Sequence, residues 1–200
     1  SVLFADFEGF SKKSKSMSPE ELINDLDYCF KAFDEIATRY GLEKIKTIGD
    51  AYMAVSGLPE PRDDFDEAIA DMALEMKRAL VKFNQRHSHQ FQMRIGIAVG
   101  PVVAGVIGLK KFIYDLWGDT VNLASRMESH GLPDGIQVTE STYERLKDRY
   151  EFQSRGIIDI KGKGPMTTYL LIGQRPSLNS STTLVAGVAP TQTPKKNAQD

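Results

Sequence analysis

Two aspartates occupy positions at which the chain is expected to hold divalent cations. Asp6 ends an apolar run over residues 2–7 that predicts a buried strand, and Asp50 lies in a Gly-Asp turn between two strand-like runs. In a βαββαβ sheet the first and third strands lie side by side, so both carboxylates are expected at one end of the sheet. Hard cations such as Mg²⁺ take carboxylates plus substrate phosphates as ligands, and two of them on one phosphate activate a nucleophilic oxygen and neutralise the leaving group. Taken alone, either acid is more simply explained as a turn residue.

Lys46 and Asp115 form a donor–acceptor pair that suits adenine. Adenine presents an acceptor at N1 and a donor at its 6-amino group, which a lysine and an aspartate complement. Guanine presents the opposite pattern, for which a glutamate is expected in place of Lys46. The simpler alternative is that Lys46 is a surface strand residue and Asp115 a turn acid.

Asn122 and Arg126 are four residues apart on a predicted helix and therefore share one face of it. An amide beside a guanidinium fork suits a ribose oxygen and a phosphate on which charge develops in a transition state. As an isolated pair, these residues also fit an ordinary solvated helix face.

The segment after Asp6 is a candidate phosphate-binding loop, because it leads into a predicted helix. The backbone N–H groups of Phe7, Gly9 and Phe10 stand where phosphate oxygens are commonly held, and Gly9 permits a close approach. The segment matches no Walker motif, so this signal is weak by itself.

Two basic residues complete the candidate site. Arg94 interrupts an apolar strand, and a charge there requires a partner, which favours a role in ligand binding. Lys161 opens a Lys-Gly-Lys-Gly turn that either reaches a polyphosphate or is simply an exposed loop.

Apolar periodicity predicts the elements that must position these residues. A Ser-Pro-Glu-Glu start with a capping box and a terminal Gly41 bound the first long helix. Residues 93–99 and 102–107 are predicted to form a pair of strands with a turn at Gly100 and Pro101. The strands are expected over 2–7, 42–48, 51–56, 93–99 and 102–107, and the helices over 18–40 and 64–87. This order is the βαββαβ, ferredoxin-like unit of α+β proteins.

The rest of the chain predicts a C-terminal αβαββ extension. Helices are expected over 120–128 and 140–148, and strands over 136–138, around 152 and over 169–172. From residue 174 the chain is rich in Ser, Thr, Pro, Gly and Ala, which is typical of a disordered tail or linker. The predicted organisation is therefore a domain over 1–173 and a tail over 174–200.

Composition narrows the possible partners. A net charge of −2 argues against DNA or RNA binding, which requires a basic face. The single cysteine, Cys29, fits a reducing compartment. No apolar run is long enough to cross a bilayer, and the chain opens without Met. We therefore expect a cytoplasmic catalytic domain cut from a longer protein, with any membrane anchor, regulatory domain or sensor upstream.

Five segments together resemble the catalytic domain of class III nucleotide cyclases, both adenylate and guanylate. They occur in family order, span most of residues 1–172, and lie at 4–10, 46–53, 93–97, 114–127 and 161–164. The resemblance implies cyclisation of ATP by attack of its 3′-hydroxyl on the α-phosphorus, with two Mg²⁺ or Mn²⁺ ions. It also implies a homodimer that carries its sites at the interface.

In such a dimer each site takes residues from both chains. The resemblance implies that one chain supplies the metal ligands Asp6, Asp50 and the backbone carbonyl of Phe7, with Arg94 on phosphate. The other chain would supply the purine readers Lys46 and Asp115, the transition-state residues Asn122 and Arg126, and the phosphate contact Lys161. Guanylate cyclases typically carry Glu and Cys in place of the two purine readers.

Four alternatives remain at this point. A guanylate cyclase would prefer GTP, and a dinucleotide cyclase or nucleotidyl transferase would be expected to carry its own hairpin signature, such as Gly-Gly-Asp/Glu-Glu-Phe, which is absent. An RNA-binding βαββαβ module would need exposed aromatic residues on its central strands and a basic face. A silent regulatory cyclase half usually lacks one of the expected groups, and none is missing here.

Overall fold

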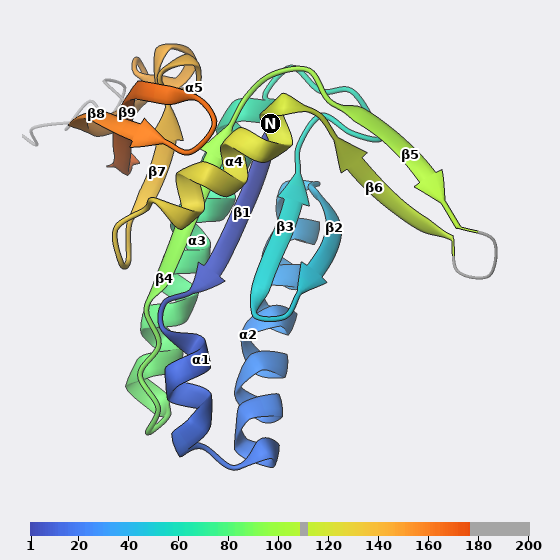
Figure 1. Cartoon of the computed structure of the whole chain (residues 1–200), viewed down its shortest axis with the longest axis vertical. Helices are drawn as coiled ribbons and strands as arrows, with labels where there is room; N and C mark the ends of the chain where they lie inside the picture. Colours follow the sequence, from blue (N-terminus) through green and yellow to red (C-terminus); the bar gives the residue numbers. More distant parts are fainter. Residues whose placement is uncertain (109–111, 177–200) are drawn as a thin grey trace, which may run out of the picture.

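A seven-stranded, mostly antiparallel sheet with the order β2-β3-β1-β4-β7-β9-β8 organises the chain (Figure 1). The computed structural model describes residues 1–108 and 112–176. The strands of this sheet are β1 (Val2–Phe7), β2 (Glu43–Ile48), β3 (Ala51–Val55), β4 (Met93–Ala98), β7 (Ile136–Thr139), β8 (Tyr150–Ile160) and β9 (Gly164–Gln174). The helices are α1 (Phe10–Lys13), α2 (Pro19–Tyr40), α3 (Phe65–Arg86), α4 (Asp119–Ser129) and α5 (Glu140–Leu146), with a 3₁₀ turn, η1, over Ser14–Ser16.

The predicted βαββαβ unit is confirmed. Strand β1 lies between β3 and β4 and is antiparallel to both, with Ala5 opposite Tyr52 and Asp6 opposite Arg94. Helices α2 and α3 cover one face of these strands and α4 covers the other (Figure 1). Because both faces are covered, β1 is apolar along nearly its whole length rather than alternating.

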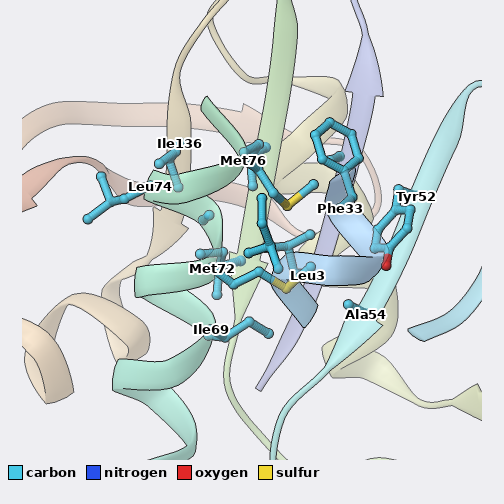
Figure 2. Packing of buried hydrophobic residues seen from close by; sticks show 14 of the residues in the cluster. Leu3, Phe33, Tyr52, Ala54, Ile69, Met72, Leu74, Met76 and Ile136 are labelled. Carbon is cyan, nitrogen blue, oxygen red and sulfur yellow. The ribbon is translucent and has the colours of Figure 1, made fainter. Parts of the chain in front are cut away.

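The main core lies between the sheet and the helix pair α2 and α3. Leu3 and Tyr52 from the sheet meet Phe33 of α2 and Met72 and Met76 of α3 (Figure 2). A smaller apolar cluster lies on the α4 side of the sheet; it includes Val2, Phe4, Met53, Val55, Ala98, Leu116 and Ala124. Helix α4 is therefore seated by its own buried contacts.

Helix α2 begins and ends where the sequence predicts. The Ser18 side chain accepts a hydrogen bond from the Glu21 N–H, and the Glu21 carboxylate accepts one from the Ser18 N–H. Gly41 ends the helix with φ of 66°, a left-handed conformation that favours glycine. The short helix α1 and the turn η1 were not predicted.

The predicted pairing of residues 93–99 with 102–107 is wrong. Strand β5 (Val103–Ile107) instead pairs with β6 (Ile113–Trp117), which was not predicted, in a separate two-stranded ribbon that extends away from the sheet (Figure 1). The edge of β4 that β5 was expected to occupy is taken by β7, parallel to it. The Thr120 hydroxyl donates to the Pro101 carbonyl and so holds the chain where it leaves the sheet.

The C-terminal αβαββ extension is confirmed as α4, β7, α5, β8 and β9. Strands β8 and β9 are each eleven residues long, longer than predicted. Strand β9 runs through Gln174, and the Arg175 N–H donates to the Arg149 carbonyl, so the first residues of the predicted tail are ordered. Residues 177–200 lie outside the described part of the chain, and the predicted domain boundary remains a prediction.

No helix of the described residues is long and apolar enough to cross a membrane.

Candidate functional site

The carboxylates of Asp6 and Asp50 converge at one end of the sheet. Asp6 is near the end of β1 and Asp50 is in the β2–β3 hairpin, and because β1 and β3 are antiparallel, these positions meet. Burial raises the pKa of Asp6 to about 6, and the charge of Asp50 and a hydrogen bond with it add to the rise. The Arg94 guanidinium acts against this rise.

This pair of acids fits a magnesium or manganese site. Two carboxylates that repel each other gain stability from a divalent cation, and their hard oxygen atoms suit Mg²⁺ better than Zn²⁺. Within residues 1–108 and 112–176, no group of three or more His, Cys, Asp or Glu side chains is arranged to hold a metal ion. The remaining ligands would therefore come from backbone carbonyls, water and substrate phosphates.

Arg94 is surrounded by acids from β1, from the turn that follows it and from α4. Its Nη2 lies 3.3 Å from Asp6 Oδ2, its Nη1 lies 2.5 Å from Glu8 Oε2, and its Nε donates to Glu128 Oε1 at 3.0 Å. Sequence analysis predicted that Arg94 has a partner, and the structure gives it three carboxylates. Arg94 lies beside Asp6 and so borders the candidate metal-binding position.

Sequence analysis missed Glu8 and Glu128. Glu128 is buried, and burial, followed by the charge of Asp6, raises its pKa to about 7. A signal was present in the helix: Thr120, Ala124 and Met127 form the buried stripe of α4, and Glu128 continues it. An acid at such a position requires a cationic partner.

Lys46 and Asp115 lie together in an ion pair, although 69 residues separate them. Lys46 projects from β2 of the main sheet and Asp115 from β6 of the ribbon. Burial acts to raise the pKa of Asp115, but the Lys46 ammonium and the Leu116 N–H outweigh it and hold that pKa below its usual range. Both side chains are partly exposed, so a donor and an acceptor are available side by side.

Asn122, Arg126 and Lys161 line one cavity of about 370 Å³. Asn122 and Arg126 come from α4, and Lys161 comes from the β8–β9 turn. Lys163, another lining residue, is 2.5 Å from Asp119 at the start of α4. The structure therefore brings Lys161 to the predicted helix face that carries Asn122 and Arg126.

Gly96 on β4 sets how closely α4 approaches the sheet. A Cβ at this position would lie 2.7 Å from the carbonyl carbon of Met127 and would overlap the backbone of Ala124 and Glu128. Glycine thus permits direct contact between the helix backbone and the strand.

The candidate phosphate loop lies directly after the acidic pair. Gly9 has φ of 64° and caps α1, and its carbonyl accepts from the N–H groups of Lys12 and Lys13. Phe7 is buried, with its ring 6.3 Å from that of Phe10 and 5.3 Å from that of Phe91. These aromatic contacts hold the loop against the core.

The candidate residues fall into three groups: the acidic pair of Asp6 and Asp50, the ion pair of Lys46 and Asp115, and the cavity residues Asn122, Arg126 and Lys161. Among the described residues, the cavity lined by Asn122, Arg126 and Lys161 includes neither Asp6 nor Asp50 in its wall. The ion pair of Lys46 and Asp115 joins β2 to β6.

Comparison with known proteins places these features in a family. The family model described as "Adenylate and Guanylate cyclase catalytic domain" matches residues 1–173. A protein of Mycobacterium bovis named adenylate cyclase is 49% identical over 175 residues, which cover 88% of this chain and 40% of that protein. The receptor-type guanylate cyclase gcy-28 of Caenorhabditis elegans is 43% identical over 87% of this chain and 14% of its own length. The chain therefore spans well under half the length of these curated relatives.

Solved structures agree with the sequence relatives. The guanylate cyclase domain of RhGC from Catenaria anguillulae, in complex with GTP, has a TM-score of 0.84 and 36% identity, covering 87% of this chain and 96% of that one. The adenylyl cyclase CyaB from P. aeruginosa also has a TM-score of 0.84, with 28% identity and coverage of 88% and 95%.

Proposed function

Because the chain belongs to the adenylate and guanylate cyclase catalytic-domain family, we propose that it converts ATP to 3′,5′-cyclic AMP and pyrophosphate. Relatives with both substrate names are similar to it, so the choice of ATP rests on its own residues. The ion pair of Lys46 and Asp115 is the observation that carries this choice. It offers a donor to adenine N1 and an acceptor to the 6-amino group, whereas guanine requires the reverse pattern.

The reaction forms a bond between the ribose 3′-oxygen and the α-phosphorus and breaks the bond from that phosphorus to the bridging oxygen of pyrophosphate. The 3′-hydroxyl proton is released to water. Asn122 orients the ribose, and Arg126 stabilises the charge that develops on the phosphate in the transition state. Arg94, Lys161 and the backbone of Phe7, Gly9 and Phe10 hold the phosphate chain.

Asp6, Asp50 and the backbone carbonyl of Phe7 are the proposed metal ligands. Two divalent ions bound there, Mg²⁺ or Mn²⁺, would lower the pKa of the 3′-hydroxyl and neutralise phosphate charge. The mutual repulsion of the two acids supports this assignment, since a cation between them removes it.

The active form is proposed to be a homodimer with two composite sites. The acidic pair of one chain would meet the adenine pair and the cavity of Asn122, Arg126 and Lys161 from its partner. The cavity of Asn122, Arg126 and Lys161 has neither acid in its wall, which supports this arrangement. The exposed apolar side chains of the β5–β6 ribbon also support it, since such patches commonly mark interfaces; they include Val103, Val106, Ile107, Phe112 and Ile113. An upstream regulatory domain, and membrane contact through it, stay predictions.

The deciding experiment measures cyclic AMP and cyclic GMP formed from ATP and GTP in the presence of Mg²⁺ or Mn²⁺. We expect kcat/KM to favour ATP in the natural sequence. The double variant Lys46→Glu, Asp115→Cys should shift the preference towards GTP, because it reverses the hydrogen-bonding pattern. A natural sequence that prefers GTP would overturn the proposal.

A further inference from the structure

Each of the three guanidinium nitrogens of Arg94 faces a different carboxylate. The Nε–Glu128 hydrogen bond is 3.0 Å long, and the Nη2–Asp6 contact, at 3.3 Å, is the longest of the three. The Glu128 side chain is 11% exposed, against 23% for Asp6 and 35% for Glu8. The Glu128 side chain is therefore the most deeply buried of the three partners as a whole.

The backbone holds Glu128 in place. Its amide lies directly over Gly96, which is two residues from Arg94 on the same strand. A carboxylate carried by a helix pressed so closely onto β4 has little freedom to follow Arg94 if that side chain moves. By contrast, Asp6 is a proposed metal ligand, and its contact with Arg94 would be exchanged for the metal.

We propose that Glu128 is a positioning residue that anchors Arg94 through Nε and thereby aims Nη1 and Nη2 at the substrate triphosphate. Fixing Nε fixes the plane of the guanidinium, because the group is rigid and planar. The two outer nitrogens then become available for a bidentate contact with phosphate oxygens once Asp6 turns to the metal and the phosphate displaces Glu8 from Nη1. This inference rests on the proposed cyclase function.

A purely structural role for Glu128 gives a different expectation. If the ion pair only fastens α4 to β4, its loss should weaken the fold and reduce the binding of every ligand alike. If it positions Arg94, its loss should reduce binding of the triphosphate and spare the nucleoside.

The variant Glu128→Gln separates these roles, because glutamine keeps the shape and one acceptor but removes the charge. The probes are 3′-deoxy-ATP, which lacks the attacking hydroxyl, and 3′-deoxyadenosine, which lacks the phosphates. By calorimetry we expect the Kd of 3′-deoxy-ATP to rise roughly 10–100-fold, by analogy with the loss that follows when the hydrogen-bond partner of a metal ligand is removed. The Kd of 3′-deoxyadenosine should be unchanged. Equal changes for both ligands, or none for either, would overturn the proposal.

A double-variant cycle tests whether Glu128 acts through Arg94. In an Arg94→Ala background, Glu128→Gln should cause no further loss of 3′-deoxy-ATP affinity, whereas losses that multiply would contradict the proposal. Glu144→Gln is the matched control, because Glu144 is an exposed acid on α5 that contacts Lys147. It should leave both Kd values unchanged.

Two further measurements keep the outcomes separate. If Glu128→Gln does not fold, Glu128→Asp replaces it: its carboxylate falls one methylene short of Nε, so a loss confined to 3′-deoxy-ATP supports the proposal and equal losses refute it. Cyclic AMP formation by the natural sequence is measured in parallel. Absence of that activity counts against the proposed function, whereas unchanged affinities in Glu128→Gln count against the role of Glu128.

Discussion

Among single residues, Asp6 has a pKa that the folded structure changes strongly. Its surroundings raise its pKa from 3.8 to about 6, through burial and then the charge of Asp50. The folded protein thus holds this proton more tightly than the unfolded chain does. Consequently, the contribution of Asp6 to the free energy of unfolding is complete below about pH 4 and is lost as the pH rises through about 6. The charged groups that act on Asp6 are Asp50, Arg94 and Glu128, and Glu8 shares Arg94 with it.

A divalent metal should offset this loss of stability. We expect Mg²⁺ to raise the Tm more at about pH 7.5 than at about pH 5, because a protonated Asp6 competes with the metal at the lower pH. Thermal unfolding with Mg²⁺ or with a chelator measures the effect. In Asp50→Asn the shift should nearly vanish, and an equal shift at both pH values would contradict the assignment of Asp6 as a ligand.

Arg126 and Lys161 should differ in the kinetic parameter that they affect. Arg126→Ala is expected to lower kcat by about 10²–10³ with little change in KM, because its contact strengthens in the transition state. Lys161→Ala should mainly raise KM, since its phosphate contact is present from binding onwards. Initial rates against ATP concentration measure both, and a change in KM alone for Arg126→Ala would mean that it binds substrate instead.

Among the elements, α4 carries residues with two proposed roles. Asn122 and Arg126 line the cavity that also includes Lys161, whereas Glu128 accepts a hydrogen bond from Arg94 near the acidic pair. In the proposed homodimer these groups belong to two different sites, so one rigid helix would connect both.

Displacing α4 should therefore reduce both stability and activity. We expect Gly96→Ala to lower the free energy of unfolding by about 1–3 kcal/mol or more, because the added methyl group overlaps the helix backbone. Activity should fall as well, since the residues on α4 shift with it. Urea denaturation and turnover are the measurements. Gly173→Ala is the matched control: Gly173 is also on a strand, and a Cβ there meets nothing within 4 Å. Equal stability of the two variants would contradict this account of α4.

The β5–β6 ribbon shows the limit of local patterns. Residues 93–107 contain two runs typical of strands around a Gly-Pro turn, and nothing nearby in sequence distinguishes a hairpin from two strands in different sheets. The outcome depends on β7, which occupies the neighbouring edge of β4 from about 40 residues further along the chain.

For the whole molecule, the proposed composite sites predict that two inactive variants complement each other. Asp6→Asn removes a metal ligand, and Arg126→Ala removes a transition-state group. In a mixed dimer, one site would receive both defects and the other would be intact. An equimolar mixture should thus recover about a quarter of the natural activity, since half of the dimers are mixed and each has one complete site.

The assay compares the activity of each variant alone with that of the mixture after exchange of subunits. Asp6→Asn mixed with Asp50→Asn is the control, because both defects remove metal ligands from the same half-site and no intact site forms from either arrangement. Recovery in the control, or none in the test mixture, would contradict composite sites.

The sequence by itself determined most of the elements and the chemical character of the site. Local periodicity and capping specify β1 and α2, because these signals depend on residues a few positions apart. The residue types at Asp6, Asp50, Lys46 and Asp115 likewise indicate oxygen ligands and a donor–acceptor pair, since side-chain chemistry does not depend on the fold.

Only the tertiary structure decided which of these residues meet. It placed Lys46 beside Asp115 across two sheets, gave Arg94 three acidic partners, and put Glu128 against Gly96. The physical reason is that such contacts depend on which strand edges are free and on how closely two backbones approach. Both are properties of the assembled chain, and the identity of a single residue does not specify them.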